Sequence, residues 1–223
     1  MIRRVKMKLS NETIDVLKNF SSINQNILIK EGNKVRTMST MKNILGEADI
    51  AESFPKGFGI YDLNEFLGVL TLAKDPELEF GNESYLTIRG GLSKVTYFFS
   101  DPSILVTPPE TFNAPETDVT FRVTRESLAK VTKASAVMQL PDLVFTGTSQ
   151  GVTMAVTDLK NTTSNQFEES WEHEGDKAFQ FNYKIENLKM IPGDYDVSVS
   201  TTALVSNWKG AIDYWIALEQ PNE

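Results

Sequence analysis

The sequence contains no cysteine and a single histidine, His173, among 223 residues. The absence of cysteine excludes disulfides, iron–sulfur clusters and thiol catalysis, and is typical of proteins that work in a reducing cytoplasm. No hydrophobic run approaches the length of a transmembrane helix, and no long apolar segment follows the basic residues near the N-terminus, so neither a membrane span nor a secretory signal is expected.

Recognised catalytic motifs are also missing. The pairs Gly90–Gly91 and Gly57–Gly59 lack the Lys-Ser/Thr of a phosphate-binding loop and the spacing of a dinucleotide fold, and no Gly-x-Ser-x-Gly nucleophile elbow occurs. His173 lies in an acidic stretch, residues 168–176, which we interpret as a solvated loop because a histidine metal site usually has a second nitrogen or sulfur ligand. We therefore predict no enzyme activity, no metal and no cofactor.

Net positive charge is lacking as well. The formal net charge is −8, from 22 basic and 30 acidic side chains. Spread evenly, this charge would repel DNA, because non-specific affinity for a duplex comes from cations that meet phosphates. The first ten residues carry four basic side chains and no acidic one, which suggests a short basic arm and leaves the rest of the chain more acidic still. Any DNA-binding surface must therefore be a local patch.

The chain does contain an internal repeat. Residues 9–14 and 123–128 match in residue type at nearly every position, at an offset of 114, and each predicts a helix start with Ser10 or Thr124 as N-cap. On the second helix, one side carries Leu128, Val131, Ser135 and Met138, and the opposite side carries Arg125, Lys130 and Lys133. Such a helix would bury its apolar side and expose a basic one.

A second device recurs in each half. Residues 58–72 predict a strand that runs into a helix capped by Asp62, with Glu65 three residues later as in a capping box. In the second half, residues 179–183 alternate as in a strand, and Ile185 and Leu188 begin a short helix that Pro192 ends. Further strands are predicted at residues 26–30, 34–41, 44–50, 77–80, 85–89, 94–99, 143–148, 151–158, 194–200, 203–208 and 211–218. The predicted fold is α+β, with two similar domains at 1–100 and 118–223 and a Pro-rich linker at 101–117.

Several of these motifs resemble the sliding clamps of T-even-type bacteriophages, which are DNA polymerase processivity factors. The resemblance rests on residues 7–10, 17–20, 60–64, 66–68, 101–103, 189–190, 192–193 and 217–219. It therefore spans nearly the whole chain. The matching pattern begins at Met7, so residues 1–6 are interpreted as a possible basic extension.

The resemblance implies a homotrimeric ring around duplex DNA, in which each domain places an antiparallel sheet outside and two helices facing the hole. It also implies binding of the DNA polymerase C-terminal peptide, opening by a clamp loader ATPase, a role in late transcription, and action in the cytoplasm of the infected bacterial host. The resemblance implies neither a cofactor nor a membrane partner.

Candidate site residues follow from the helix faces and the resemblance together. The DNA-facing set is Lys18, Arg125, Lys130, Lys133, Lys184 and Lys189. We expect the second domain to dominate, because Glu12 and Asp15 leave the polar face of the first helix negative. The predicted partner pocket comprises Ile104, Leu105, Val106, Trp215 and Ala217. A basic face is also what an ordinary exposed amphipathic helix presents, and apolar linker residues also pack on their own domain.

Two other functions fit the same sequence. A structural virion protein built from duplicated β-rich domains would explain the acidity, the strands and the missing chemistry. A small hydrolase would have to use His173, the one histidine available as a base. Stimulation of a phage polymerase separates the clamp from the virion protein, and unchanged activity of His173→Ala excludes the hydrolase.

Overall fold

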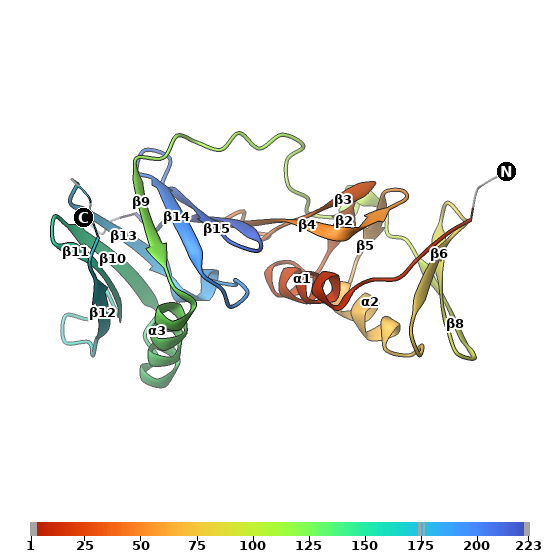
Figure 1. The fold of residues 1–223 in the computed structure, drawn as a ribbon, viewed down its shortest axis with the longest axis horizontal. Helices are drawn as coiled ribbons and strands as arrows, with labels where there is room; N and C mark the ends of the chain where they lie inside the picture. The colour runs from red at the N-terminus through yellow and green to blue at the C-terminus, as the bar shows by residue number, and fades with distance from the viewer. Residues whose placement is uncertain (1–3, 174, 176, 221–223) are drawn as a thin grey trace. The chain divides into compact units, whose positions relative to one another are not determined.

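The chain folds into two compact units, residues 1–112 and 113–223 (Figure 1). The computed structural model describes residues 4–173, 175 and 177–220. Each unit contains its own helices, its own antiparallel strands and its own apolar core. The two units are therefore described separately.

The first unit packs two α-helices with short antiparallel strands. The helices are α1 (Asn11–Ile23), α2 (Leu63–Leu70) and the 3-10 turn η1 (Pro102–Ile104). The strands are β1 (Val5–Met7), β2 (Ile27–Ile29), β3 (Gly32–Met38), β4 (Ile44–Phe54), β5 (Phe58–Ile60), β6 (Glu77–Phe80), β7 (Tyr85–Gly90) and β8 (Ser93–Phe98). They pair in the order β1-β6-β7-β8, while β2 pairs with β5 and β3 with β4.

The predicted helix caps of the first unit are present. The hydroxyl of Ser10 accepts a hydrogen bond from the Thr13 amide at 3.2 Å. The Asp62 carboxylate accepts from the amides of Asn64 and Glu65 at 2.9 and 3.1 Å, which satisfies two amides that the first turn of α2 leaves unpaired. The apolar stripes behind these caps are buried at Leu17, Phe20, Ile23, Leu63, Phe66 and Leu70.

The second unit repeats the plan with fewer helical residues. It contains α3 (Arg125–Met138) and the 3-10 turn η2 (Ile185–Asn187). The strands are β9 (Val119–Val123), β10 (Asp142–Thr148), β11 (Gly151–Thr157), β12 (Phe167–Trp171), β13 (Phe179–Lys184), β14 (Tyr195–Ser200), β15 (Val205–Lys209) and β16 (Asp213–Ala217). One antiparallel sheet has the order β12-β11-β10-β13, and β9, β14, β15 and β16 follow one another in a second.

The predicted second helix of this unit is only the single turn η2. Lys184 occupies the position that Asp62 holds before α2, and the structure shows no side-chain cap hydrogen bond there. A lysine has no acceptor to cap a helix. The amide of Ile185 donates instead to the carbonyl of Pro141, at 2.9 Å, and Pro192 follows seven residues later. The segment therefore lacks both a cap and the length for a stable α-helix.

Two further expectations are corrected. Of the predicted basic arm, residues 1–3 lie outside the described residues, and residues 5–7 form β1, which pairs with β6, because Lys6 pairs with Glu77 and Val5 is partly buried. Residues 168–171 belong to strand β12 and not to a loop, because the side chains of Phe167, Glu169 and Trp171 alternate with exposed ones and are partly buried. Glu174 and Asp176 of the acidic stretch lie outside the described residues.

Candidate nucleic-acid and partner surfaces

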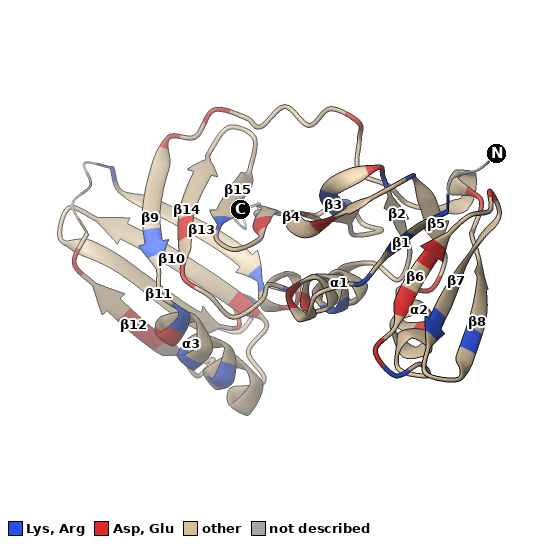
Figure 2. Cartoon of the chain, turned by 45° about the vertical axis from the view of Figure 1, so that its right-hand side comes forward, with Lys and Arg blue, Asp and Glu red and all other residues tan. Residues whose placement is uncertain are grey.

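Helix α3 is amphipathic as predicted. The hydroxyl of Thr124 accepts from the Ser127 amide at 3.2 Å and starts the helix. Leu128 and Val131 are buried, while Met138 is only partly buried. The opposite side, with Arg125, Lys130 and Lys133, is exposed, and Figure 2 shows the basic residues along this helix. Exposed cations on one helix face are the arrangement that can meet phosphates.

Lys130 is charge-compensated within its own unit. Its Nζ lies 2.9 Å from a carboxylate oxygen of Glu126 and 3.2 Å from one of Glu169 on β12. The hydrogen bonds to Glu126 and then to Glu169 raise the pKa of Lys130, so it stays protonated. Ser127 donates to the same oxygen of Glu169 at 3.2 Å, so these contacts tie α3 to β12. A phosphate would have to compete with two carboxylates for this lysine.

Lys184 is part of a partly buried ion pair. Its Nζ donates to Asp142, whose side chain is only 2% exposed. The other Asp142 oxygen accepts from the Leu159 amide at 2.9 Å. The Asp142 hydrogen bond is the main cause that raises the pKa of Lys184. This lysine neutralises a buried carboxylate, which is a structural role.

The remaining predicted cations differ in how far their charge is balanced. Lys18 on α1 pairs with Asp15 at 3.0 Å. The backbone amide of Arg125 donates to Asp194 at 2.7 Å, and the positive side chains of Arg122 and Arg125 help to hold the pKa of Asp194 low. Across the residues that the structure describes, Lys133 forms no ion pair, so its charge is the least compensated on α3. Lys189 is exposed.

The five residues of the predicted partner pocket divide between the two units. Ile104 is exposed, Leu105 is buried, and Val106 is partly buried with its amide donating to the Asn26 side chain at 3.0 Å. These contacts pack the first part of the linker onto the first unit. Trp215 and Ala217 lie on β16 of the second unit and are partly buried.

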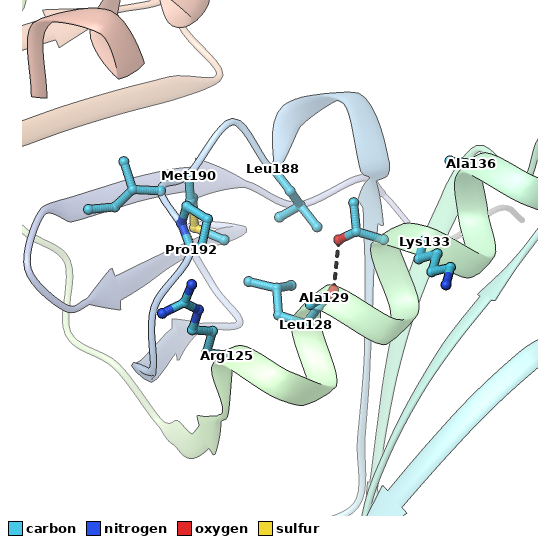
Figure 3. Close-up of a pocket in the computed structure, with 10 residues that line it drawn as sticks. Arg125, Leu128, Ala129, Lys133, Ala136, Leu188, Met190 and Pro192 are labelled. Carbon is cyan, nitrogen blue, oxygen red and sulfur yellow. Dashed lines mark hydrogen bonds between the residues drawn. The ribbon is translucent and has the colours of Figure 1, made fainter. Parts of the chain in front are cut away.

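A groove lies beside α3 that the sequence analysis did not predict, although it singled out Arg125 and Lys133, which line it. Its cavity volume is about 400 Å³, and it is lined by Arg125, Leu128, Ala129, Thr132, Lys133, Ala136, Leu188, Met190, Ile191 and Pro192 (Figure 3). The sequence signal that could have indicated it is the run Leu-Lys-Met-Ile-Pro at 188–192. This run contains three large apolar side chains, whereas ending a helix requires only the proline.

Metal and membrane features are absent from the described part of the chain. Within residues 4–173, 175 and 177–220, no cluster of three or more His, Asp or Glu side chains could hold a metal ion. Over the same residues, none of the helices combines the length and the apolar character needed to cross a bilayer.

Comparison with known proteins defines the class of fold. The chain superimposes on A. fulgidus PCNA, in a structure with the C-terminal region of FEN-1 bound to it, with a TM-score of 0.73, 12% identity and coverage of 99% of both chains. It also matches pol III beta of Caulobacter crescentus, with a TM-score of 0.71 and 12% identity over 98% of this chain and 66% of the other. The fold is therefore the DNA clamp fold, α+β with two similar domains.

Sequence comparison then gives the family. Residues 8–107 match the family model for the DNA polymerase processivity factor, and residues 120–220 match that for the gp45 sliding clamp, C terminal. The sliding clamp of Vibrio phage KVP40 is 35% identical over 96% of this chain and 99% of its own length, and that of Enterobacteria phage T4 is 28% identical over 85% of each. The chain belongs to the phage sliding-clamp family of DNA polymerase processivity factors, and the resemblance seen in the sequence is confirmed.

Proposed function

We propose that three copies of this chain close into a ring around duplex DNA and tether the replicative polymerase of a phage. The observation that carries the proposal is α3, a helix whose apolar side is buried in its unit while the side with Arg125 and Lys133 is exposed. A ring holds DNA by enclosing it, so its contacts can be few, weak and directed at phosphates, which carry no sequence information.

The second unit supplies most of the proposed DNA contact. Lys133 and Arg125 are its leading residues, since Lys130 and Lys184 are engaged by carboxylates. Lys189 remains in the proposed set as an exposed cation, and Lys18 contributes less because Asp15 pairs with it. DNA would therefore be held by a small number of cations on an otherwise acidic protein.

Ring closure is supported by two edge strands that present apolar or charged side chains to solvent. β8 ends one sheet of the first unit, where Phe98 is 67% exposed, and β12 ends a sheet of the second unit, where Glu168 is exposed. An unpaired strand edge invites pairing with another chain, and a head-to-tail contact between two different edges generates a closed ring when the rotation fits. We assign β8 of one copy and β12 of the next to this contact.

The proposed polymerase site uses the linker residues Ile104, Leu105 and Val106 of the first unit, and Trp215 and Ala217 of the second unit stay in the predicted set. The A. fulgidus clamp, solved with a C-terminal region of another protein bound, supports this kind of partner. A peptide that docks there would rely on a few apolar anchors. Ile104→Asp changes an exposed side chain, so loss of polymerase stimulation by an intact trimer carrying this change would support the pocket.

The ring requires a loader that opens it, and we propose a clamp loader ATPase of the same phage, acting in the cytoplasm of the infected host. A role in late transcription is proposed alongside replication. Transcription from a late promoter, measured with and without the loaded clamp, tests that role separately.

The decisive experiment measures DNA synthesis by the cognate polymerase and loader on primed circular DNA. We expect the protein to increase the length of the products made in one binding event. The triple change of Arg125, Lys130 and Lys133 to Glu should abolish this increase while the trimer mass stays the same. Full stimulation by the triple variant would remove α3 from the DNA-facing wall.

A further inference from the structure

The two units differ in what lies beside their first helix. In the first unit, α1 and α2 pack against each other. In the second unit, the segment that corresponds to α2 forms only the turn η2 and then the irregular residues 188–192. The groove of about 400 Å³ lies between these residues and α3. In the first unit, α2 packs beside α1. In the second unit, no α-helix packs beside α3 at the corresponding position.

The lining of the groove is mainly apolar. Leu188, Met190 and Pro192 face α3 from the other side in the close-up (Figure 3). Thr132 adds no unmet polar group, because its hydroxyl donates to the Leu128 carbonyl at 2.7 Å. Ala129 and Ala136 are exposed and small, so an incoming backbone can approach the helix closely. Such a surface favours an apolar ligand side chain over water.

Two cations line the same groove. Arg125 and Lys133 are eight residues apart on α3, which corresponds to about 12 Å along the helix axis, or roughly two turns. A ligand that satisfies both cations and the apolar lining is therefore a two-turn amphipathic helix with an acidic residue near each end.

We propose that this groove docks a short amphipathic helix of a partner protein, with apolar residues three or four positions apart between flanking Asp or Glu residues. Duplex DNA would engage only the two cations, because phosphates gain nothing from Leu188, Met190 or Pro192. The site goes beyond the proposed clamp function and does not depend on ring closure. If α3 also faces DNA, the two ligands share Arg125 and Lys133 and exclude each other.

The test is a selection of random 12-residue peptides that bind the full-length protein but not its Ala136→Glu variant. Ala136 is exposed, so this change places a carboxylate in the groove without removing a buried contact. Val137→Glu is the matched control, since Val137 is 75% exposed on the same helix, does not line the groove and receives the same charge. Unchanged far-UV circular dichroism of both variants shows that α3 remains folded.

We expect the selected peptides to carry apolar residues flanked by acids, to lose at least tenfold in affinity for Ala136→Glu and for the double variant Arg125→Ala, Lys133→Ala, and to bind Val137→Glu normally. The affinity for a short DNA duplex should fall by the same factor in both Glu variants, because each adds one negative charge to α3. Failure to recover any peptide that distinguishes Ala136→Glu from Val137→Glu, or recovery of basic peptides only, would overturn the docking site. Neither result bears on polymerase stimulation, which tests the clamp function by itself.

Discussion

At the scale of single residues, the same side-chain types have different roles according to their partners. Lys184 and Lys133 are both lysines of the second unit that the sequence places in a DNA-facing set. The structure pairs Lys184 with the buried Asp142, whereas Lys133 forms no ion pair with any residue in the described ranges. The first lysine is therefore expected to affect stability, and the second to affect DNA binding.

Lys184→Met should lower the free energy of unfolding by about 2 kcal/mol, because it leaves Asp142 buried without its counter-charge. The loss is below that of a fully buried pair, because Lys184 is partly exposed in the wild-type protein. Urea denaturation measures the change. Lys160→Met, a change of an exposed lysine in the same unit, should stay within about 0.5 kcal/mol. If the double variant Asp142→Asn, Lys184→Met is no more stable than Lys184→Met alone, the uncompensated charge is not the cause.

Asp62→Ala should destabilise the first unit by about 1 kcal/mol at neutral pH, through loss of the α2 N-cap. The amide of Glu65, followed by the side chain of Gln25, holds the pKa of Asp62 below its ordinary value of 3.8. A depressed folded-state pKa contributes stability above pH 3.8 that is lost as the pH falls through the folded value. The difference between wild type and Asp62→Ala should therefore shrink below about pH 4.

Thermal unfolding followed over a pH series provides the comparison. Asp62→Asn keeps the capping acceptor but cannot ionise, so it should be nearly as stable as wild type at pH 7. A constant difference between Asp62→Ala and wild type from pH 7 to pH 3 would contradict the role of the ionised carboxylate.

At the scale of elements, α3 illustrates how strand neighbours redistribute the charge of a helix face. Its sequence presents three basic residues on one side, and β12 contributes Glu169, which with Glu126 engages Lys130. The basic face is thus less positive than the helix alone implies. The positive charges of Arg125 and Lys133 are less compensated by carboxylates than that of Lys130, and both residues also line the apolar groove.

Lys133→Gln should reduce the salt dependence of duplex binding by about 0.9 in the slope of log K against log salt, as expected for the loss of one phosphate contact. Lys130→Gln should change the slope less, because its charge is already balanced by two carboxylates. Fluorescence anisotropy with a short duplex over a salt series measures both, with Lys18→Gln on α1 as the counterpart in the first unit. An equal loss for Lys130→Gln would show that DNA displaces Glu126 and Glu169.

At the scale of the whole molecule, the proposed assembly depends on strand edges that one chain leaves unpaired. β8 and β12 each end a sheet, and Phe98 on β8 is held by an edge-on contact with Tyr85, at 5.5 Å between ring centroids, while most of its surface stays exposed. A large, exposed aromatic side chain on an edge strand is typical of an interface residue.

Phe98→Asp should convert the proposed trimer to monomers without unfolding the first unit, because a charge at an apolar contact is costly only when it is buried by the partner. Sedimentation or light scattering gives the mass. Leu72→Asp is the control, since Leu72 is 64% exposed but lies outside both edge strands. A trimer that survives Phe98→Asp would place the contact between copies on another surface.

The sequence by itself determined the helix starts, most of the strands and the family, but not β1, β9 and β12 or the short length of η2. The N-caps Ser10, Asp62 and Thr124 and the apolar stripes behind them are local patterns, and the structure confirms all three. The caps succeed as predictors because a cap hydrogen bond joins residues only two or three positions apart, so nothing distant is needed to form it. The internal repeat and the clamp family are also visible in the sequence, because both rest on short local motifs.

Tertiary structure alone decided how the charges and exposed surfaces are used. The carboxylates of Asp142 and Glu169 lie 42 and 39 positions from the lysines they engage, so no local pattern could reveal these two contacts. Only the Glu126–Lys130 pair, four positions apart on α3, is local. Likewise, the missing cap at Lys184 is visible in the sequence, but the groove beside α3 exists only because two segments, 125–136 and 188–192, pack together although they are more than 50 positions apart. Ion pairs and grooves depend on long-range proximity, which the chain acquires only when its sheets form.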